Sequence, residues 1–226
     1  MNKIINIAID GPAGAGKSTL ARKLAADLQL VYVDTGAMYR TIGLYMARCG
    51  VDATDAAAVE ARLPEINLEL RYVDGVQCMI LNGEDVSRAI RTEEASVNAS
   101  KVSAIPAVRA FLLETQRGLA RKCSVIMDGR DIGTVILPNA DLKIFLTASA
   151  EERAKRRYTE QVERGEKVSY EEILREIQER DIRDTTRATA PLKPAEDAVT
   201  LDTPGHTLED SLAIMKALLK ERVGLE

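Results

Sequence analysis

The octapeptide at positions 11–18, Gly-Pro-Ala-Gly-Ala-Gly-Lys-Ser, constrains the fold of this chain more than any other feature. It fits the pattern G-x-x-x-x-G-K-[ST], which requires a strand before it and a helix after it. The apolar run 4–9 has strand length, and Leu20, Leu24 and Leu28 recur every fourth residue on one face of a helix. The motif therefore stands in the context that a phosphate-binding loop needs.

The chemistry of this loop follows from its residue types. Glycines let successive backbone N–H groups turn inward on a phosphate, and the helix N-terminus adds roughly half a positive charge. We expect the Lys17 ammonium to reach the β and γ phosphates and the Ser18 hydroxyl to hold Mg²⁺. The predicted nucleotide contacts are Gly11, Pro12, Ala13, Gly14, Ala15, Gly16, Lys17, Ser18 and Thr19.

The rest of the chain alternates apolar runs of strand length with amphipathic stretches. This alternation is typical of a parallel sheet flanked by helices, so we predict a doubly wound α/β fold. The further strand runs are 30–33, 124–127, 142–146 and 198–201. Between residues 64 and 90 the pattern changes to two alternating runs, 67–73 and 76–81, joined by Asp74-Gly75, which is a strong hairpin signal.

We expect one domain with two parts that interrupt its core. An antiparallel insert within a parallel fold needs a reason, and we expect it to cover a site. Two charged helices with little apolar surface follow residue 150, and we expect them to move as a lid. Capping-box patterns at Ser149 with Glu152 and at Ser169 with Glu172 mark their starts. The expected division is core 1–61, 101–150 and 188–226, insert 62–100, and lid with its following helix 151–187.

Composition excludes several classes of protein. The 31 Lys and Arg against 35 Asp and Glu give a net charge of −4, so we expect no nucleic-acid partner. The spacing of Cys49, Cys78 and Cys123 fits reduced thiols and a cytoplasmic protein. One histidine, His206, excludes a His-rich metal site. No apolar run approaches the roughly 18 residues of a membrane span, and without a heptad seam we expect a monomer.

A phosphate-binding loop alone does not define a function, because kinases, switches and motors share it. A guanine-reading switch needs an Asn/Thr-Lys-x-Asp run, and the one Asn-Lys pair, at residues 2–3, lacks the Asp. Three arginine-containing segments, 34–40, 128–133 and 179–187, suit phosphoryl transfer, whose charge spreads over several oxygens. Any one of these arginines is alternatively a solvated or ion-paired surface charge.

Taken together, these segments closely resemble bacterial cytidylate kinases of the P-loop nucleoside monophosphate kinase family. The resemblance covers nearly the whole chain, and its specific parts are D-G-R-D-I-G at 128–133, R-D-x-R-D at 180–184 and the long insert. It implies a P-loop monophosphate-kinase fold with a monophosphate-binding insert and a helical lid. It also implies transfer of the γ-phosphoryl group of ATP, with Mg²⁺, to CMP or dCMP.

The resemblance also implies a role for individual residues. Lys17, Arg40, Arg130 and Arg187 form the expected catalytic set, of which the three arginines hold the acceptor phosphate. Arg180 and Asp184 contact the sugar, while Ser100, Arg109 and Asp131 read cytosine, with Thr35 close by. Thr35 stands where the family more often has Ser and keeps the hydroxyl. On the lid, Arg153 and Arg157 are candidates to meet ATP, although ion pairing along their helix is the alternative.

The residues themselves support one of these roles. A carboxylate at Asp131 accepts from the exocyclic amine of cytosine but would face the bare O4 of uracil, so cytosine is favoured. Arg109 can donate to O2, which both pyrimidines carry. Asp34 and Asp128 end strands near the loop, where each either holds Mg²⁺ or caps the next turn. A kinase for UMP or AMP, and a nucleotide-hydrolysing switch, remain the alternatives.

Overall fold

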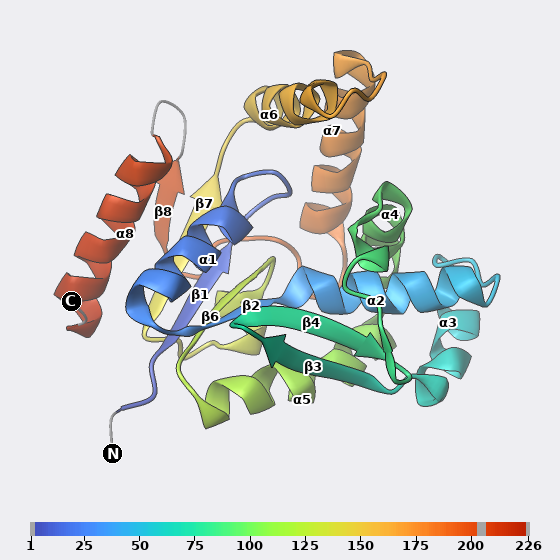
Figure 1. Cartoon of the computed structure of the whole chain (residues 1–226), viewed down its shortest axis with the longest axis horizontal. Helices are drawn as coiled ribbons and strands as arrows, with labels where there is room; N and C mark the ends of the chain where they lie inside the picture. Colours follow the sequence, from blue (N-terminus) through green and yellow to red (C-terminus); the bar gives the residue numbers. More distant parts are fainter. Residues whose placement is uncertain (1–2, 203–206, 225–226) are drawn as a thin grey trace.

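The computed structural model describes residues 3–202 and 207–224, and His206 lies outside them. Within these ranges, a five-stranded sheet has the order β2-β6-β1-β7-β8, and every neighbouring pair in it is parallel. The predicted α/β architecture is therefore confirmed (Figure 1). The strands of this sheet are β1 (Asn6–Asp10), β2 (Val31–Asp34), β6 (Val125–Gly129), β7 (Leu142–Thr147) and β8 (Val199–Asp202).

Helices cover both faces of this sheet. On one face lie α1 (Lys17–Leu28) and α8 (Leu208–Val223), and on the other α2 (Thr35–Arg48) and α5 (Pro106–Lys122). Strand residues alternate between the two cores: Ile7 and Ile9 pack with α1 and α8, whereas Ala8 packs with the opposite cluster. Burial on both faces explains why the strands read as continuous apolar runs.

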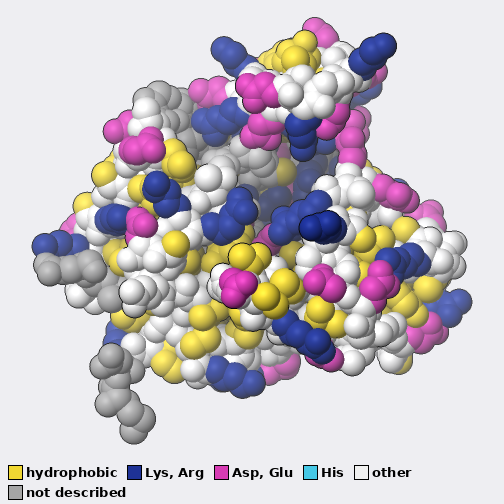
Figure 2. Space-filling model, viewed as in Figure 1, with side chains coloured by type: hydrophobic (Ala, Val, Ile, Leu, Met, Phe, Trp, Pro, Cys, Tyr) yellow, Lys and Arg dark blue, Asp and Glu magenta, His cyan; other side chains and the backbone are white. Residues whose placement is uncertain are grey.

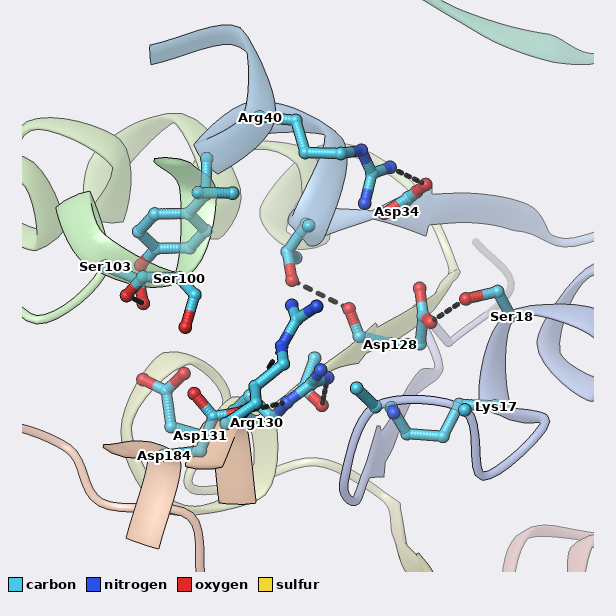
Figure 3. Close-up of a pocket in the computed structure, with 18 of the residues that line it drawn as sticks. Lys17, Ser18, Asp34, Arg40, Ser100, Ser103, Asp128, Arg130, Asp131 and Asp184 are labelled. Carbon is cyan, nitrogen blue, oxygen red and sulfur yellow. Dashed lines mark hydrogen bonds and ion pairs between the residues drawn. The ribbon is translucent and has the colours of Figure 1, made fainter. Parts of the chain in front are cut away.

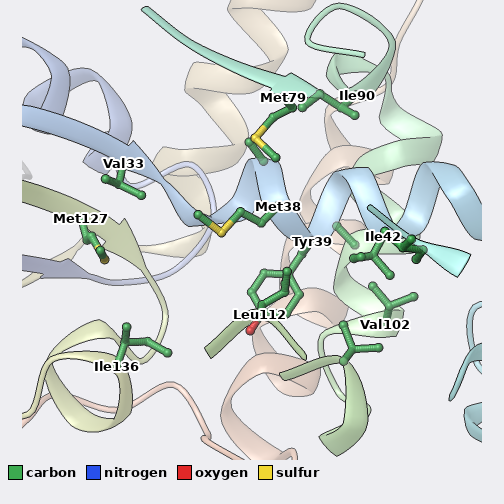
Figure 4. Packing of buried hydrophobic residues seen from close by; sticks show 14 of the residues in the cluster. Val33, Met38, Tyr39, Ile42, Met79, Ile90, Val102, Leu112, Met127 and Ile136 are labelled. Carbon is green, nitrogen blue, oxygen red and sulfur yellow. The ribbon is translucent and has the colours of Figure 1, made fainter. Parts of the chain in front are cut away.

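The core on the α2 face joins the sheet to the inserted segment. Figure 4 shows Met38 and Ile42 of α2 between Met79 and Ile90 of the insert and Leu112 of α5. All five of these side chains are buried. The α2 helix is therefore held from several sides, and its first turn, which follows the end of β2, is fixed relative to the sheet.

The insert contains an antiparallel sheet of three strands, β3 (Leu68–Val73), β4 (Val76–Leu81) and β5 (Glu84–Asp85). Val73 pairs with Val76, and both turn residues have positive φ, 51° at Asp74 and 75° at Gly75. This is the two-residue turn that the Asp-Gly signal predicts. The shorter elements around it are α3 (Ala56–Arg62), η1 (Leu63–Glu65), η2 (Ala89–Arg91) and α4 (Glu93–Val102).

The two charged helices, α6 (Ala150–Glu163) and α7 (Tyr170–Thr186), stand out from the body of the protein (Figure 1). They pack on each other through a small cluster of Ala154, Ile173 and Ile177. The capping box at Ser149 is confirmed. At Ser169 only half of the predicted box forms. The Ser169 hydroxyl oxygen accepts from the Glu172 N–H at 3.4 Å, but the described structure has no return bond from the Ser169 N–H to the Glu172 carboxylate.

Among the described residues, no helix has the length and apolar character to cross a membrane. The remaining element, the π-helical turn η3 (Ile132–Ile136), follows β6 after two intervening residues. Turns of this kind are rare and occur often at functional sites, and this one starts within the 128–133 segment.

Close contact between α2 and α4 predicts opposite effects for two Gly-to-Ala changes. A Cβ at Gly43 would lie 2.9 Å from the Asn98 Cβ, whereas the nearest atom to a Cβ at Gly118 in α5 is 3.8 Å away. We expect Gly43→Ala to lower the free energy of unfolding by about 1–3 kcal/mol through overpacking. Gly118→Ala, the matched control, should raise it by up to about 1 kcal/mol through helix propensity. Urea titration measures both, and equal effects would contradict the close packing.

Candidate functional site

A cleft of about 240 Å³ opens at the carboxyl ends of β1, β2 and β6, and the end of α7 lines it with Arg180 and Asp184 (Figure 3). Ligands gather at this edge in parallel α/β sheets. Of its described lining residues, six are Lys or Arg and four are Asp, an excess of cations in a chain whose net charge is −4. Figure 2 shows Lys and Arg side chains along the hollow between the α6–α7 pair and the body of the protein.

The structure brings the predicted acceptor residues together in this cleft, although they come from five separate segments. Helix α2 brings two of them, α4 and α5 one each, the loop after β6 two, and α7 with the residue that follows it three. Lys17, Ser18 and Asp128 line the same cleft. All nine residues that we expect to contact the acceptor line this cleft: Thr35, Arg40, Ser100, Arg109, Arg130, Asp131, Arg180, Asp184 and Arg187.

The phosphate-binding loop is shaped by a close approach to β7. Gly11 has φ 148°, and a Cβ there would lie 1.9 Å from the Leu146 carbonyl oxygen, so only glycine fits. Lys17 opens α1 and its ammonium donates to the Pro12 carbonyl at 2.7 Å. Burial, reinforced by the charge of Arg130, lowers the pKa of Lys17 below its ordinary value. An anion bound in the loop would counter this lowering of the Lys17 pKa, because it attracts the charged form of the ammonium.

Ser18 and Asp128 meet at the loop, as a metal site requires. The Ser18 hydroxyl donates to one Asp128 carboxylate oxygen at 2.6 Å, and the Tyr32 hydroxyl donates to the other at 3.0 Å. Burial, and then the charge of Asp34, raises the pKa of Asp128. Hydroxyl and carboxylate oxygens suit Mg²⁺. No group of three or more His, Cys, Asp or Glu residues that could hold a metal is found in the described ranges, so phosphate and water oxygens would complete the site.

Asp34 takes the second of its two expected roles. Its carboxylate caps α2 by accepting from the Ala37 N–H at 2.9 Å. The same carboxylate pairs with Arg40 at 2.8 Å (Figure 3) and with Arg91 at 3.4 Å. Asp34 therefore caps α2 and anchors two arginines.

Three cations crowd the middle of the cleft. Arg130 donates to Asp184 at 2.9 Å, and the Arg180 guanidinium lies 4.0 Å from the same carboxylate. Burial, followed by repulsion from Arg130, lowers the pKa of Arg180 to about 10. Lys17 is affected by the charges of both arginines. The three positive charges thus lie close enough to repel one another, and a polyanion bound among them would remove that cost.

A buried ion pair between Arg109 and Asp131 lies at the end of the cleft away from Lys17. The Arg109 guanidinium also stacks 5.6 Å from the centre of the Tyr39 ring and donates to the Ser103 carbonyl at 3.1 Å. Arg187 lies at this end as well, 3.9 Å from Asp131. The residues expected to read a base are therefore adjacent, and Arg187, expected at a phosphate, stands beside them.

Several buried donors of this cleft have no hydrogen-bond partner in the described parts of the chain. They are the Ser100 hydroxyl, Nε of Arg40, Nε of Arg180 and one terminal nitrogen of Arg187. Buried polar groups are paired in the great majority of cases, and leaving one unpaired costs about 1–3 kcal/mol. Their concentration around one cavity indicates that a polar, anionic ligand supplies the missing acceptors.

Sequence reasoning missed three residues here. Asp10 is buried at the end of β1, where its carboxylate accepts from the backbone N–H groups of Ile132 and Gly133, both at 2.7 Å. It thereby ties the loop before Gly11 to the segment that carries Asp131. Its place as the last residue of a strand before the motif was an available signal. Tyr39 and Ser103 had no signal of their own, because Tyr39 meets Arg109 and Ser103 meets Arg187, which are distant in sequence.

A second hollow, of about 440 Å³, lies on the other side of the phosphate-binding loop, and Gly14 lines both. Arg153 and Arg157 line this second hollow, as expected for contacts with a nucleotide donor. Arg153 is buried and pairs with Asp181 at 3.0 Å while donating to the Ala13 carbonyl at 3.1 Å. Arg157 pairs with Glu93 of α4 at 2.7 Å, so it bridges the lid and the insert.

Comparison with known proteins agrees with this geometry. The sequence profile of the family described as "Cytidylate kinase" matches residues 7–221. A protein named cytidylate kinase from Caldicellulosiruptor saccharolyticus is 48% identical over 99% of this chain and 99% of its own length. One of the same name from Caldicellulosiruptor bescii is 50% identical over 93% of each chain.

Among solved structures, an uncharacterized protein from Eubacterium ventriosum shares the fold. The TM-score is 0.52 and the identity 14%, over 97% of this chain and 100% of that one. At this identity the likeness concerns the architecture alone.

Two serines of the cleft should differ in their effect on stability. The Ser100 hydroxyl is buried without a partner, whereas the Ser103 hydroxyl donates to the Ser100 carbonyl at 2.9 Å and accepts from Arg187 at 3.4 Å. We expect Ser100→Ala to leave the free energy of unfolding unchanged or higher, and Ser103→Ala to lower it by about 1 kcal/mol. Chemical denaturation without ligand tests this, and a large loss in Ser100→Ala would show a bonded hydroxyl.

Asp10 should make stability depend on pH. Burial, opposed in part by the two backbone hydrogen bonds, raises the pKa of Asp10 from 3.8 to about 6. The folded protein then keeps this proton up to about pH 6, while the unfolded chain loses it near pH 4. Stability from this group therefore falls as pH rises through that interval. Between pH 5 and 7.5, the stability advantage of the wild type over Asp10→Asn should shrink by about 1 kcal/mol. A constant difference in urea titrations would refute the raised pKa.

Proposed function

This chain belongs to the cytidylate kinase family, and on that premise we propose that its cleft phosphorylates CMP or dCMP with ATP as the donor. The products are ADP and CDP or dCDP. The observation that carries the proposal is one cleft beside the phosphate-binding loop whose lining residues hold several buried donors without a hydrogen-bond partner in the described chain. These residues are Ser100, Arg40, Arg180 and Arg187. An acceptor that carries both a phosphate and a polar base satisfies them together.

ATP would enter the second hollow with its phosphates in the loop at residues 11–18, and the acceptor would occupy the cleft on the other side. Lys17 and Gly14 line the cleft, and Gly14 also lines the donor hollow, which supports transfer across the loop. The γ phosphorus would then lie among Lys17, Arg130 and Arg180. Anionic oxygens there would raise the pKa of Lys17 back toward its ordinary value and neutralise the mutual repulsion of the three cations.

The reaction is a direct in-line displacement. An oxygen of the acceptor phosphate forms a bond to the γ phosphorus, the bond from that phosphorus to the β–γ bridging oxygen breaks, and ADP leaves with the electron pair. The acceptor oxygen is already anionic at neutral pH, so no strong general base is needed. Positioning and charge neutralisation by Lys17, Arg40 and Arg130 supply the catalysis.

Mg²⁺ fits the proposed site, and when bound it would neutralise charge on the donor phosphates. Ser18 is the protein ligand that we propose, with Asp128 accepting from its hydroxyl or holding a metal-bound water. The contact at 2.6 Å turns the Ser18 hydroxyl proton to Asp128, which would leave the oxygen lone pairs for the metal.

At the base end, Asp131 would accept from the cytosine amine and Arg109 would donate to O2. Their ion pair keeps both side chains buried in position when no base is bound. Because Arg187 lies 3.9 Å from Asp131 and donates to Ser103, we propose that it contacts the base end of the acceptor more than its phosphate. Arg180 and Asp184, next along the cleft, suit the sugar.

Closure of the two interrupting segments would exclude water from the transfer. We propose that the insert 62–100 and the lid 151–187 move against the core 1–61, 101–150 and 188–226. The independent apolar cluster of α6 and α7 supports this movement, because the pair can shift without opening the main core. We further propose a monomer in the cytoplasm, since one chain supplies every named site residue and Cys49, Cys78 and Cys123 are free thiols.

The test is ADP formation from MgATP with CMP, dCMP, UMP, AMP or GMP offered separately, beside a reaction without acceptor. We expect a large and selective response to CMP and dCMP. Preference for another monophosphate would overturn the base assignment, and hydrolysis that ignores every acceptor would overturn the kinase. Repeating the panel on Asp131→Asn separates base reading from catalysis.

Asp131→Asn places an amide where uracil O4 would lie, so the ratio of kcat/KM for CMP over UMP should fall on the order of tenfold or more. Asp184→Asn is the matched control. It removes a buried carboxylate of the same cleft that pairs with Arg130, not with the base-reading Arg109. It should lower activity with both pyrimidines and keep their ratio. An unchanged ratio in Asp131→Asn would contradict its role.

A further inference from the structure

Strand β2 forms the edge of the parallel sheet next to the cleft, and side chains of the insert make hydrogen bonds to its backbone. Strand β2 ends the sheet order, so its outer backbone groups have no neighbouring strand within the sheet. The hairpin of the insert lies beside it (Figure 1). The Tyr72 hydroxyl donates to the Tyr32 carbonyl at 3.1 Å, and the Gln77 amide bonds Asp34 two residues further on.

The contact of Gln77 with Asp34 is made twice. The Gln77 side-chain oxygen accepts from the Asp34 backbone N–H at 2.8 Å, and its amide nitrogen donates to the Asp34 carbonyl at 3.3 Å. A backbone that runs beside an edge strand offers the same pair of groups. One glutamine side chain thus takes the place of a further strand at the last residue of β2.

The side chain of Asp34 links this backbone contact to the cleft. Its buried carboxylate accepts from the Ala37 N–H and pairs with Arg40 at 2.8 Å. Arg40 lines the cleft, and its Nε is buried without a partner in the described chain. Arg91, from the same insert as Gln77, pairs with the Asp34 carboxylate at 3.4 Å. The insert therefore contacts Asp34, the partner of Arg40, at two places: Gln77 bonds its backbone and Arg91 pairs with its side chain.

We propose that Gln77 is a positioning residue for the acceptor phosphate: it fixes Asp34, and through Asp34 it sets the place of Arg40. This rests on the proposed function. The side chain is suited to the task because it carries one acceptor and one donor at the same reach. Glutamate at this position would set a carboxylate against the Asp34 carbonyl, and leucine would make neither bond. Movement of the insert would then carry Arg40 with it.

The test compares Gln77→Leu with Tyr72→Phe, which removes the neighbouring edge bond but leaves Asp34 untouched. Both variants lose hydrogen bonds to β2, so a structural effect alone would appear in both. We expect Gln77→Leu to raise the KM for CMP on the order of tenfold while the KM for ATP stays within about twofold. Tyr72→Phe should keep both KM values near those of the wild type.

A double-mutant cycle with Arg40→Ala tests the route. If Gln77 acts through Arg40, Gln77→Leu should add little to the KM for CMP in the Arg40→Ala background. The full rise in that background, an equal rise in both KM values, or an unchanged KM for CMP would overturn the proposal. If the wild type prefers another monophosphate, the proposed function fails, and the same comparison on that acceptor still decides the role of Gln77. Acceptor-free hydrolysis alone would overturn both.

Discussion

The structure depends on holding several positive charges close together inside a folded protein. Lys17 is buried, Arg130 and Arg180 are half-buried, and the three lie within reach of one another's charge. Burial and this mutual repulsion lower the pKa of Lys17 and bring that of Arg180 to about 10. Buried carboxylates, above all Asp184 and Asp128, make the arrangement stable enough to fold. The cleft still carries an excess of cations, so binding of a polyanion is favoured before any specific contact is considered.

The scaffold places these charges through a few close contacts. Gly11 lets the phosphate-binding loop pass against Leu146, and Gly43 lets α2 approach α4, which carries Ser100. Asp10 joins the loop to the turn after β6 by two backbone hydrogen bonds. The rigid sheet thus fixes the phosphate end, while the insert and the α6–α7 pair carry residues that approach it from outside. This division suits an enzyme that must admit two nucleotides and then exclude water.

Much of this could be predicted from the sequence, because local patterns carried it. The Asp-Gly turn, the capping box at Ser149 and the strand–loop–helix order of the nucleotide motif are each decided within a few residues. Prediction failed at Ser169, where the hydroxyl oxygen accepts from the Glu172 N–H but, within the described residues, the Glu172 carboxylate makes no return bond to the Ser169 backbone. It was also silent on Asp10, Tyr39 and Gln77, whose partners are distant in sequence.

The sequence by itself determined the fold class, the phosphate-binding loop and the family, since residue periodicity and motif spacing are properties of the chain. Tertiary structure alone decided which charges meet. It paired Arg109 with Asp131, Arg153 with Asp181, and Asp34 with both Arg40 and the N-terminus of α2. The reason is physical: the partner of an ionisable side chain, its pKa and the donors or acceptors that it leaves unpaired all depend on atoms that only folding brings within a few ångströms.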